Sequence, residues 1–145
     1  MRYGIAYGPG CHPDTIMSRF ITNAINGVPL TITGNGNTYR NFLNVNDHAR
    51  GNYLALCDEA KNETINLEGP EKITLIEVAN RVKELHSGDV IIEYTDQRYG
   101  DYKGKVVDNR KAAAILGWKP TINFKTGSKT LYEYIKKNID HSASR

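Results

Sequence analysis

Apolar residues recur along the chain with two different spacings, and each spacing predicts one kind of element. Between Asp14 and Gly27 the apolar positions lie three or four residues apart, which predicts an amphipathic helix. The apolar positions of this helix are Ile16, Met17, Phe20, Ile21, Ala24 and Ile25. We expect Asp14 to cap its start and Gly27 to be the left-handed residue after its end. Before it, residues 2–6 predict a short strand that the Gly/Pro-rich residues 7–10 terminate.

Alternating positions in the next segment predict strands. Residues 30–33 alternate between apolar side chains and threonine, and Gly34-Asn35-Gly36-Asn37 separates them from a second strand over residues 39–45. Two strands joined by a Gly/Asn turn predict a β-hairpin. A helix capped by Asn46 or Asp47 is expected to follow.

The second half of the chain continues this mixture of strands and helices. Residues 64–67 predict a brief strand, and Thr74-Leu75-Ile76-Glu77 has the pattern of a capping box at the start of a helix. Residues 90–94 predict another strand. The polar residues 95–105 show no periodicity, which is typical of a functional or mobile loop.

Two further helices are predicted near the carboxyl end, the first capped by Asp108 and the second by Thr126. We expect Leu131, Tyr134 and Ile135 to face inward on the second. Residues 140–145 are polar and predict a disordered tail. With about five short strands among these helices, the fold class is α/β.

Composition excludes several classes of protein. The 145 residues hold 19 Lys and Arg against 16 Asp and Glu, for a net charge of +3. Residues 109–145 carry eight bases and two acids, but the lysines are dispersed and no nucleic-acid-binding signature accompanies them, so we expect a solvated surface and no nucleic-acid partner. No apolar run approaches the roughly 20 residues of a membrane span, and we expect no membrane partner.

Cysteine usage and the first residues favour an intracellular setting. Cys11 and Cys57 cannot form a multi-bridge scaffold, and we expect both to be reduced. The amino-terminal residues show no basic leader followed by an apolar stretch, so no secretory signal is expected. The sequence therefore predicts a cytoplasmic protein.

Familiar catalytic patterns are incomplete. Gly34-Asn35-Gly36 resembles the start of a dinucleotide-binding loop, but Tyr39 replaces its last glycine and a strand is predicted after it instead of a helix. Tyr-x-x-x-Lys occurs at Tyr99/Lys103, in the predicted loop, and at Tyr132/Lys136, which we expect on the exposed side of the last helix. The four histidines are far apart and show no metal-ligand spacing. We predict no catalytic residue and no metal site in this chain.

Two arginines could instead bind an anion. Arg40 follows the Gly-rich turn, and Arg98 stands three residues before Asp101 in the predicted loop. Each guanidinium can donate two parallel hydrogen bonds to a phosphate, and a carboxylate can accept from ribose hydroxyls. Ordinary salt bridges are the alternative interpretation of both arginines.

Five stretches match known motifs in a fixed order. The motifs R-x-x-N-x-Y-G-P, G-x-P-L-x-I-x-G-x-G, Q-x-R-D-F-x-x-V-x-D, R-x-G-D and D-x-x-K-A-x-x-x-L-G-W-x-P are similar to residues 2–9, 27–36, 38–47, 98–101 and 108–120. Asn66 also resembles the Asn of a Y-N-x-G strand end. Over residues 2 to about 137 the chain thus resembles extended short-chain dehydrogenase/reductases, the family of NAD-dependent nucleotide-sugar epimerases and dehydratases.

The resemblance implies a fold and a domain division. It corresponds to the carboxyl-terminal half of the family, which supplies the last strands of a Rossmann-like NAD(P)-binding fold and a small α/β substrate-binding domain. Residues 1–13 would belong to the Rossmann part and residues 14–139 to the substrate-binding domain. The Gly-rich cofactor loop and the catalytic Tyr-x-x-x-Lys of the family would precede Met1. NAD would therefore be bound mainly by another half, and a homodimer of the whole protein is left open.

The resemblance also implies which residues bind a nucleoside-diphosphate sugar. Arg40 and Arg98 would hold the diphosphate, and Asp101 would contact the ribose. The remaining substrate-binding residues implied are Phe42 in the same pocket, Thr31 and Thr33 along the base, and Thr15 near the phosphates. The residues that would pass close to the nicotinamide are Tyr3, Gly4 and Ile5. Two positions depart from the family, because Ile5 replaces its usual Asn and Asn41 its usual Asp.

Two classes of function follow. The first is the nucleotide-sugar-binding portion of an NAD-dependent epimerase, most similar to UDP-glucose 4-epimerases and inactive alone. A portion of a dehydratase or reductase is a variant of the same class. The second is a stand-alone module that binds a nucleotide sugar or a protein.

Overall fold

The computed structural model of the chain describes residues 1–96 and 107–143. Most of the predicted loop, with Arg98, Tyr99, Asp101 and Lys103, lies outside these residues. The strands are β1 (Arg2–Tyr3), β2 (Ile5–Tyr7), β3 (Leu30–Thr33), β4 (Tyr39–Asn44), β5 (Asn66–Leu67), β6 (Lys72–Thr74) and β7 (Ile92–Thr95). The helices are α1 (Ile16–Ile25), α2 (Val45–Leu54), the 3-10 turn Asp58–Ala60, α3 (Leu75–Leu85), α4 (Arg110–Leu116) and α5 (Phe124–Ala143).

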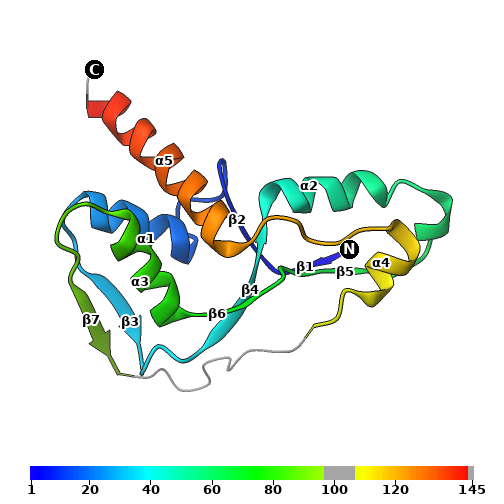
Figure 1. Cartoon of the computed structure of the whole chain (residues 1–145), viewed down its shortest axis with the longest axis horizontal. Coiled ribbons are helices and arrows are strands. Elements are labelled where there is room, and N and C mark those ends of the chain that lie inside the picture. Colours follow the sequence, from blue (N-terminus) through cyan, green and yellow to red (C-terminus); the bar gives the residue numbers. More distant parts are fainter. Residues whose placement is uncertain (97–106, 144–145) are drawn as a thin grey trace.

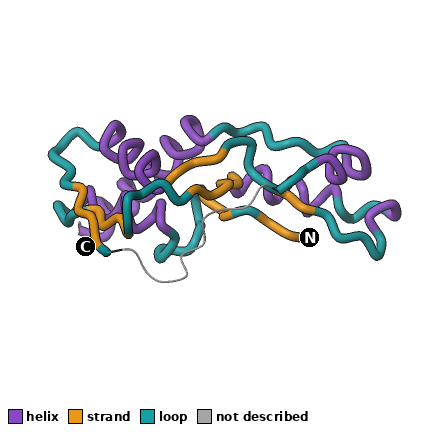
Figure 2. Tube along the Cα trace, turned by 90° about the horizontal axis from the view of Figure 1, so that it is seen from below, coloured by secondary structure: helices purple, strands orange, loops and turns teal. Residues whose placement is uncertain are grey.

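The described strands form three small sheets instead of one continuous sheet. β1 pairs in parallel with β5, and β3 pairs in parallel with β7. Between them, β4 pairs in parallel with β2 and antiparallel with β6. Figure 1 shows α1, α3 and α5 gathered with β3 and β7 in one lobe, and α2 and α4 with β1 and β5 in the other. The strands follow one another along the longest dimension of the molecule, and helices lie beside them in both lobes (Figure 2).

The predicted β-hairpin is wrong. β3 and β4 do exist on either side of the turn, but β3 pairs with β7 and β4 pairs with β2 and β6. Gly34 and Gly36 both have positive φ angles, of 66° and 74°. The turn therefore leads the chain from one sheet to another. Its Gly/Asn composition indicates a left-handed backbone conformation but not which strands pair.

The predicted first strand is split in two at Gly4. Arg2 and Tyr3 pair with β5, whereas Ile5 to Tyr7 pair with β4. The Gly4 N–H donates to the Leu67 carbonyl at 3.0 Å, which continues the first pairing up to the point of divergence. A local apolar pattern cannot show this split, because both halves are extended.

Helix ends agree with the sequence in part. Gly27 has the expected left-handed conformation, with φ of 68°, and Thr74 and Glu77 form the expected capping box. The caps predicted for α1, α2 and α5 are wrong, because α1 and α2 follow Thr15 and Asn44 and α5 already begins at Phe124. The predicted strand over residues 39–45 accordingly ends one residue early. α4 begins one residue after the predicted position, but the Asp108 carboxylate does accept from the Arg110 N–H at its start, at 2.7 Å. β6 was not predicted at all, because its three residues are too short for an alternating pattern.

The buried face of α5 differs from the prediction. Tyr132 is only 7% exposed and its hydroxyl lies 3.0 Å from His86 Nδ1, whereas Tyr134 is 42% exposed. α5 packs against both α1 and α3, so its buried face is wider than a single stripe. The helix also continues through Asp140 and His141 to Ala143, where the sequence predicted a disordered tail.

Two separate apolar clusters form the cores of the two lobes. The larger cluster contains side chains of α1, α3 and α5, with Phe42 of β4 and Tyr7 of β2 among them. The smaller one surrounds Trp118 and contains Leu43, Ile65, Leu67, Ala112 and Leu116. β4 contributes to both, because Phe42 and Leu43 point to opposite faces of the strand.

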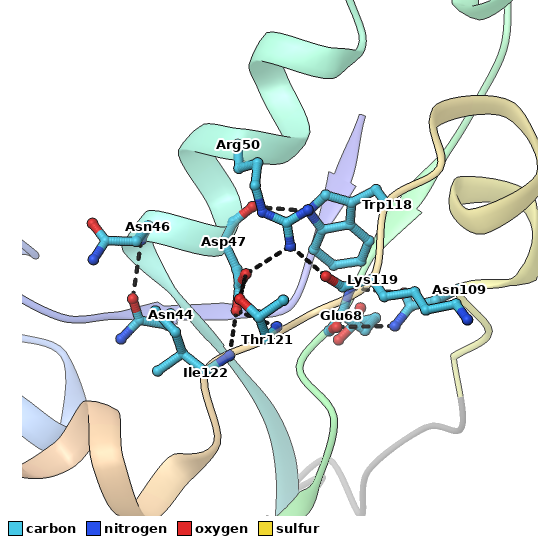
Figure 3. A network of polar contacts seen from close by, with 10 residues as sticks. All are labelled: Asn44, Asn46, Asp47, Arg50, Glu68, Asn109, Trp118, Lys119, Thr121 and Ile122. Atoms are coloured by element: carbon cyan, nitrogen blue, oxygen red, sulfur yellow. Dashed lines mark hydrogen bonds and ion pairs between the residues drawn. The ribbon is translucent and has the colours of Figure 1, made fainter.

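Asp47 connects α2 to the segment that leads into α5. Its side chain is 2% exposed and accepts hydrogen bonds from the N–H groups of Thr121 and Ile122, from the Thr121 hydroxyl and from Arg50, at 2.8–2.9 Å. Its carbonyl accepts from Trp118 Nε1 at 3.0 Å. Figure 3 shows how these groups converge on one aspartate, Trp118 on its carbonyl and the others on its carboxylate. Burial opposes its charge, but the hydrogen bonds from Arg50, Ile122 and Thr121 outweigh burial and lower the pKa of Asp47.

We expect Asp47→Asn to lower the free energy of unfolding by about 2 kcal/mol or more, because an amide cannot accept from all these donors. Urea unfolding followed by the fluorescence of Trp118 measures this free energy.

The lowered pKa of Asp47 stabilises the fold above about pH 4, the ordinary aspartate pKa, and this contribution is lost as the pH falls further. The variant should lose less stability than the wild type over that acid range. Asp58→Asn, at an exposed position, is the control, and equal stability of all three proteins would contradict the prediction.

Candidate functional site

A small pocket opens where the first strand changes partners. It has a volume of about 150 Å³. Four segments supply its walls: the β1–β2 junction, the start of β4, the residue after β5 and the chain just before α4. Its lining residues are Tyr3, Gly4, Ile5, Tyr39, Arg40, Asn41, Glu68 and Val107. The divergence of β1 and β2 creates this space, because their partner strands β5 and β4 belong to different sheets.

Gly4 keeps the pocket walls close together. A Cβ atom at this position would lie 2.5 Å from Oε2 of Glu68 and 2.7 Å from the carbonyl oxygen of Asn41. Both distances are shorter than any side chain tolerates without movement of its neighbours. Glycine is therefore required here by close approach rather than by an unusual φ angle.

Arg40 brings a positive charge to the pocket. It lies half-buried on β4, and its Nη1 donates to the carbonyl of Tyr39 at 2.8 Å. The neighbouring Tyr39 ring has the ammonium of Lys72 over it, 5.3 Å from the ring centre. A guanidinium in this position can bind a phosphate or another oxyanion.

Glu68 brings a negative charge to the same pocket. The residue is 8% exposed, and its backbone is held by the side chain of Asn109, which accepts from the Glu68 N–H at 2.9 Å and donates to the Glu68 carbonyl at 3.0 Å. Burial raises the pKa of the Glu68 carboxyl. Among the described residues, no hydrogen bond or ion pair to this carboxylate is found.

Four of the predicted site residues lie together in this pocket. Tyr3, Gly4 and Ile5, expected near a nicotinamide, share it with Arg40, expected on a diphosphate. They are 35 to 37 positions apart in the sequence but adjacent in space, because β2 pairs with β4. Arg98 and Asp101 lie outside the described residues, so their roles stay predictions.

The other predicted site residues lie elsewhere. Phe42 is buried in the core, with its ring centre 6.0 Å from that of Tyr7 and 5.4 Å from that of Phe124, and it does not line the pocket. Its neighbours on β4 point the other way, because side chains alternate along a strand. Thr31 and Thr33 lie on β3 opposite Glu93 and Thr95 of β7. They do not line the pocket either, and their contact with a base stays a prediction.

Thr15 lies at the start of α1. Its hydroxyl is 3.0 Å from that of Ser18 and 3.8 Å from Cys11 Sγ. Both neighbours line a second hollow of about 560 Å³ between α1 and α5, which shares no lining residue with the pocket around Arg40. The structure therefore does not bring Thr15 into the pocket around Arg40.

Glu68 is the pocket residue that the sequence analysis missed. The available signal was its place directly after a brief apolar strand, next to Asn66 and Leu67. An acidic residue in that place is common at exposed strand ends, and only its burial against Gly4 distinguishes it. Tyr39 and Asn41 stand out in the sequence only as departures from known motifs, and neither was predicted to bind a ligand.

Neither a metal-binding cluster nor a membrane-spanning helix is found in the described residues. In residues 1–96 and 107–143 no group of three or more His, Cys, Asp or Glu side chains is arranged to hold a metal ion. Within the same residues, no helix has both the length and the apolar character needed to cross a membrane.

Comparison with known proteins relates this chain to enzymes of nucleotide sugars. The family model for GDP-mannose 4,6 dehydratase matches residues 4–131. A probable dTDP-glucose 4,6-dehydratase from Sinorhizobium fredii is 32% identical over 141 residues, which cover 91% of this chain and 40% of that protein.

Solved structures agree in fold. UDP-glucuronic acid 4-epimerase from Bacillus cereus, in complex with UDP-glucuronic acid and NAD, superimposes with a TM-score of 0.88 at 29% identity, over 94% of this chain and 44% of that one. UDP-glucose 4-epimerase from Thermotoga maritima, with UDP-glucose, has a TM-score of 0.84 at 27% identity, over 95% of this chain and 45% of that one.

The chain spans only part of its relatives, 40% of the Sinorhizobium fredii protein and about 44–45% of the two solved chains. Its fold is accordingly an α/β, Rossmann-like fragment of theirs. Because the family model matches most of its residues, the chain belongs to the extended short-chain dehydrogenase/reductase family of NAD-dependent epimerases and dehydratases.

Proposed function

We propose that this chain is the carboxyl-terminal, nucleotide-sugar-binding portion of an NAD-dependent epimerase, most similar to UDP-glucose 4-epimerase. One observation carries the proposal: Arg40 lines the same pocket as Tyr3, Gly4 and Ile5. A group that binds diphosphate and the backbone that would meet a nicotinamide must be neighbours if a sugar is to react with NAD.

The pocket residues fit the nicotinamide end of NAD. The close approach of Gly4 to Glu68 and Asn41 leaves a backbone wall without a side chain, along which a nicotinamide could pass. Bound NAD would supply hydride transfer to and from the sugar. The residues of this chain would bind the nucleotide and orient the sugar.

The assignment to the carboxyl-terminal half rests on the order of the motifs. The matched stretches run in the family's order from residue 2 to residue 120, and the chain spans less than half of the relatives reported above. The pairing of β1 fits the same assignment, because within residues 1–96 and 107–143 β1 and β5 form a sheet of two strands. Further strands of a Rossmann sheet would continue from it.

A portion of a 4,6-dehydratase is the second candidate. The 32% identity to the Sinorhizobium fredii protein favours it. Both candidates assign the same binding role to Arg40.

Arg40→Ala should weaken the binding of UDP at least tenfold, because a charged hydrogen bond to phosphate contributes about 1.5–3 kcal/mol. Isothermal titration calorimetry of the purified chain measures this. Arg19→Ala removes an exposed arginine of α1 and should leave the affinity unchanged. Absence of UDP binding by the wild type, or equal affinity of the Arg40 variant, would contradict the proposal.

The chain alone should not convert UDP-glucose to UDP-galactose in the presence of NAD. The resemblance assigns the catalytic Tyr and Lys to another part of the protein, and Tyr132 is buried against His86, away from the pocket lining. A chromatographic assay of the products, with a full-length UDP-glucose 4-epimerase as positive control, tests this. Turnover above the no-protein background would contradict it.

A further inference from the structure

Glu68 places a buried acceptor in the pocket without a matching donor. Of the described lining residues, it is the acidic one, and its carboxylate lies so close to Gly4 that a Cβ atom there would be 2.5 Å from Oε2. Arg40 lines the same pocket, but no ion pair between Arg40 and Glu68 is found in the part of the chain that the structure describes. Asn109 binds only the Glu68 backbone.

An unpartnered buried carboxylate is costly for a fold. The Glu68 carboxyl has lost part of its hydration, and no protein donor within the described residues replaces the lost water. A ligand that brings donors would restore the missing hydrogen bonds, whereas a ligand that brings a second anion would add repulsion in a poorly hydrated space. The pocket therefore discriminates between ligands by charge as well as by shape.

Arg40 and Glu68 match different chemical groups of a ligand. Arg40 donates and so matches a phosphate oxygen, while an ionised carboxylate only accepts and so matches hydroxyl groups. A hydroxyl-bearing ring beside a diphosphate therefore satisfies both. A sugar acid would bring its own carboxylate into the space beside Glu68.

We propose that Glu68 is a specificity-determining residue that selects nucleotide sugars with a neutral, hydroxylated sugar over those with a sugar acid. The inference rests on the proposed function, because it needs a nucleotide sugar in this pocket. Family membership does not decide the point, since the names of the similar proteins include both UDP-glucuronic acid and UDP-glucose.

The burial of Glu68 can be tested without any ligand. Because burial raises its pKa, the folded chain holds this proton more tightly than the unfolded chain does, and ionisation at pH 7 destabilises the fold. Glu68→Gln should therefore raise the urea midpoint at pH 7. The gain should vanish near pH 3.5, below the ordinary glutamate pKa of about 4.3, where the carboxyl is neutral in both states. An equal difference at both pH values would contradict the assignment of a buried charge.

The specificity test compares three ligands with three proteins. Affinities for UDP, UDP-glucose and UDP-glucuronic acid are measured by calorimetry at pH 8 for the wild type, Glu68→Gln and Glu59→Gln, the last at an exposed position. The wild type should bind UDP-glucose at least tenfold more tightly than UDP-glucuronic acid. Glu68→Gln should reduce this ratio at least fivefold, and Glu59→Gln should preserve it.

The outcomes separate the two proposals. If none of the three ligands binds the wild type, the proposed function fails and the role of Glu68 fails with it. If UDP binds and the ratio of the two sugar nucleotides is close to one, or is the same in the wild type and Glu68→Gln, nucleotide binding stands and only the role of Glu68 is overturned.

Discussion

The pairing of one short segment with two different sheets is the constraint on which the pocket depends. Residues 2 and 3 pair with β5, residues 5 to 7 pair with β4, and the chain changes partner at Gly4. The partner strands diverge from that point, and the space between them is walled by Arg40 on one side and Glu68 on the other. A side chain at position 4 would occupy this space. The pocket can therefore keep its geometry only with glycine at this position.

A second constraint keeps the two lobes in register around β4. Phe42 and Leu43 are neighbours on this strand, yet one belongs to the larger apolar cluster and the other to the cluster around Trp118. Asp47, one helical turn beyond the end of β4, binds the segment of residues 121 and 122 that leads from the second lobe back to α5 in the first. The strand that carries Arg40 is thus fixed from both sides, which would pre-organise this strand for the proposed ligand.

Local signals in the sequence predicted the elements better than their partners. The apolar stripe of α1, the left-handed Gly27 and the capping box at Thr74 depend on neighbours within a few residues, and the structure confirms them. The β-hairpin failed because strand pairing is decided by distant residues: β3 joins β7, about 60 positions later. The inward face of α5 failed for a similar reason, since two neighbouring helices widen its buried surface to include Tyr132.

The sequence by itself determined the α/β class, most of the helices and, through the order of its motifs, the resemblance to the family that the comparisons then established. It also singled out Arg40 and the segment of Tyr3, Gly4 and Ile5 as separate candidates. Only the tertiary structure decided that these residues share one pocket, that Phe42 belongs to the core and that Glu68 is buried among them. The physical reason is that burial and proximity arise where strands distant in the sequence meet, whereas residue patterns record only what each segment does locally.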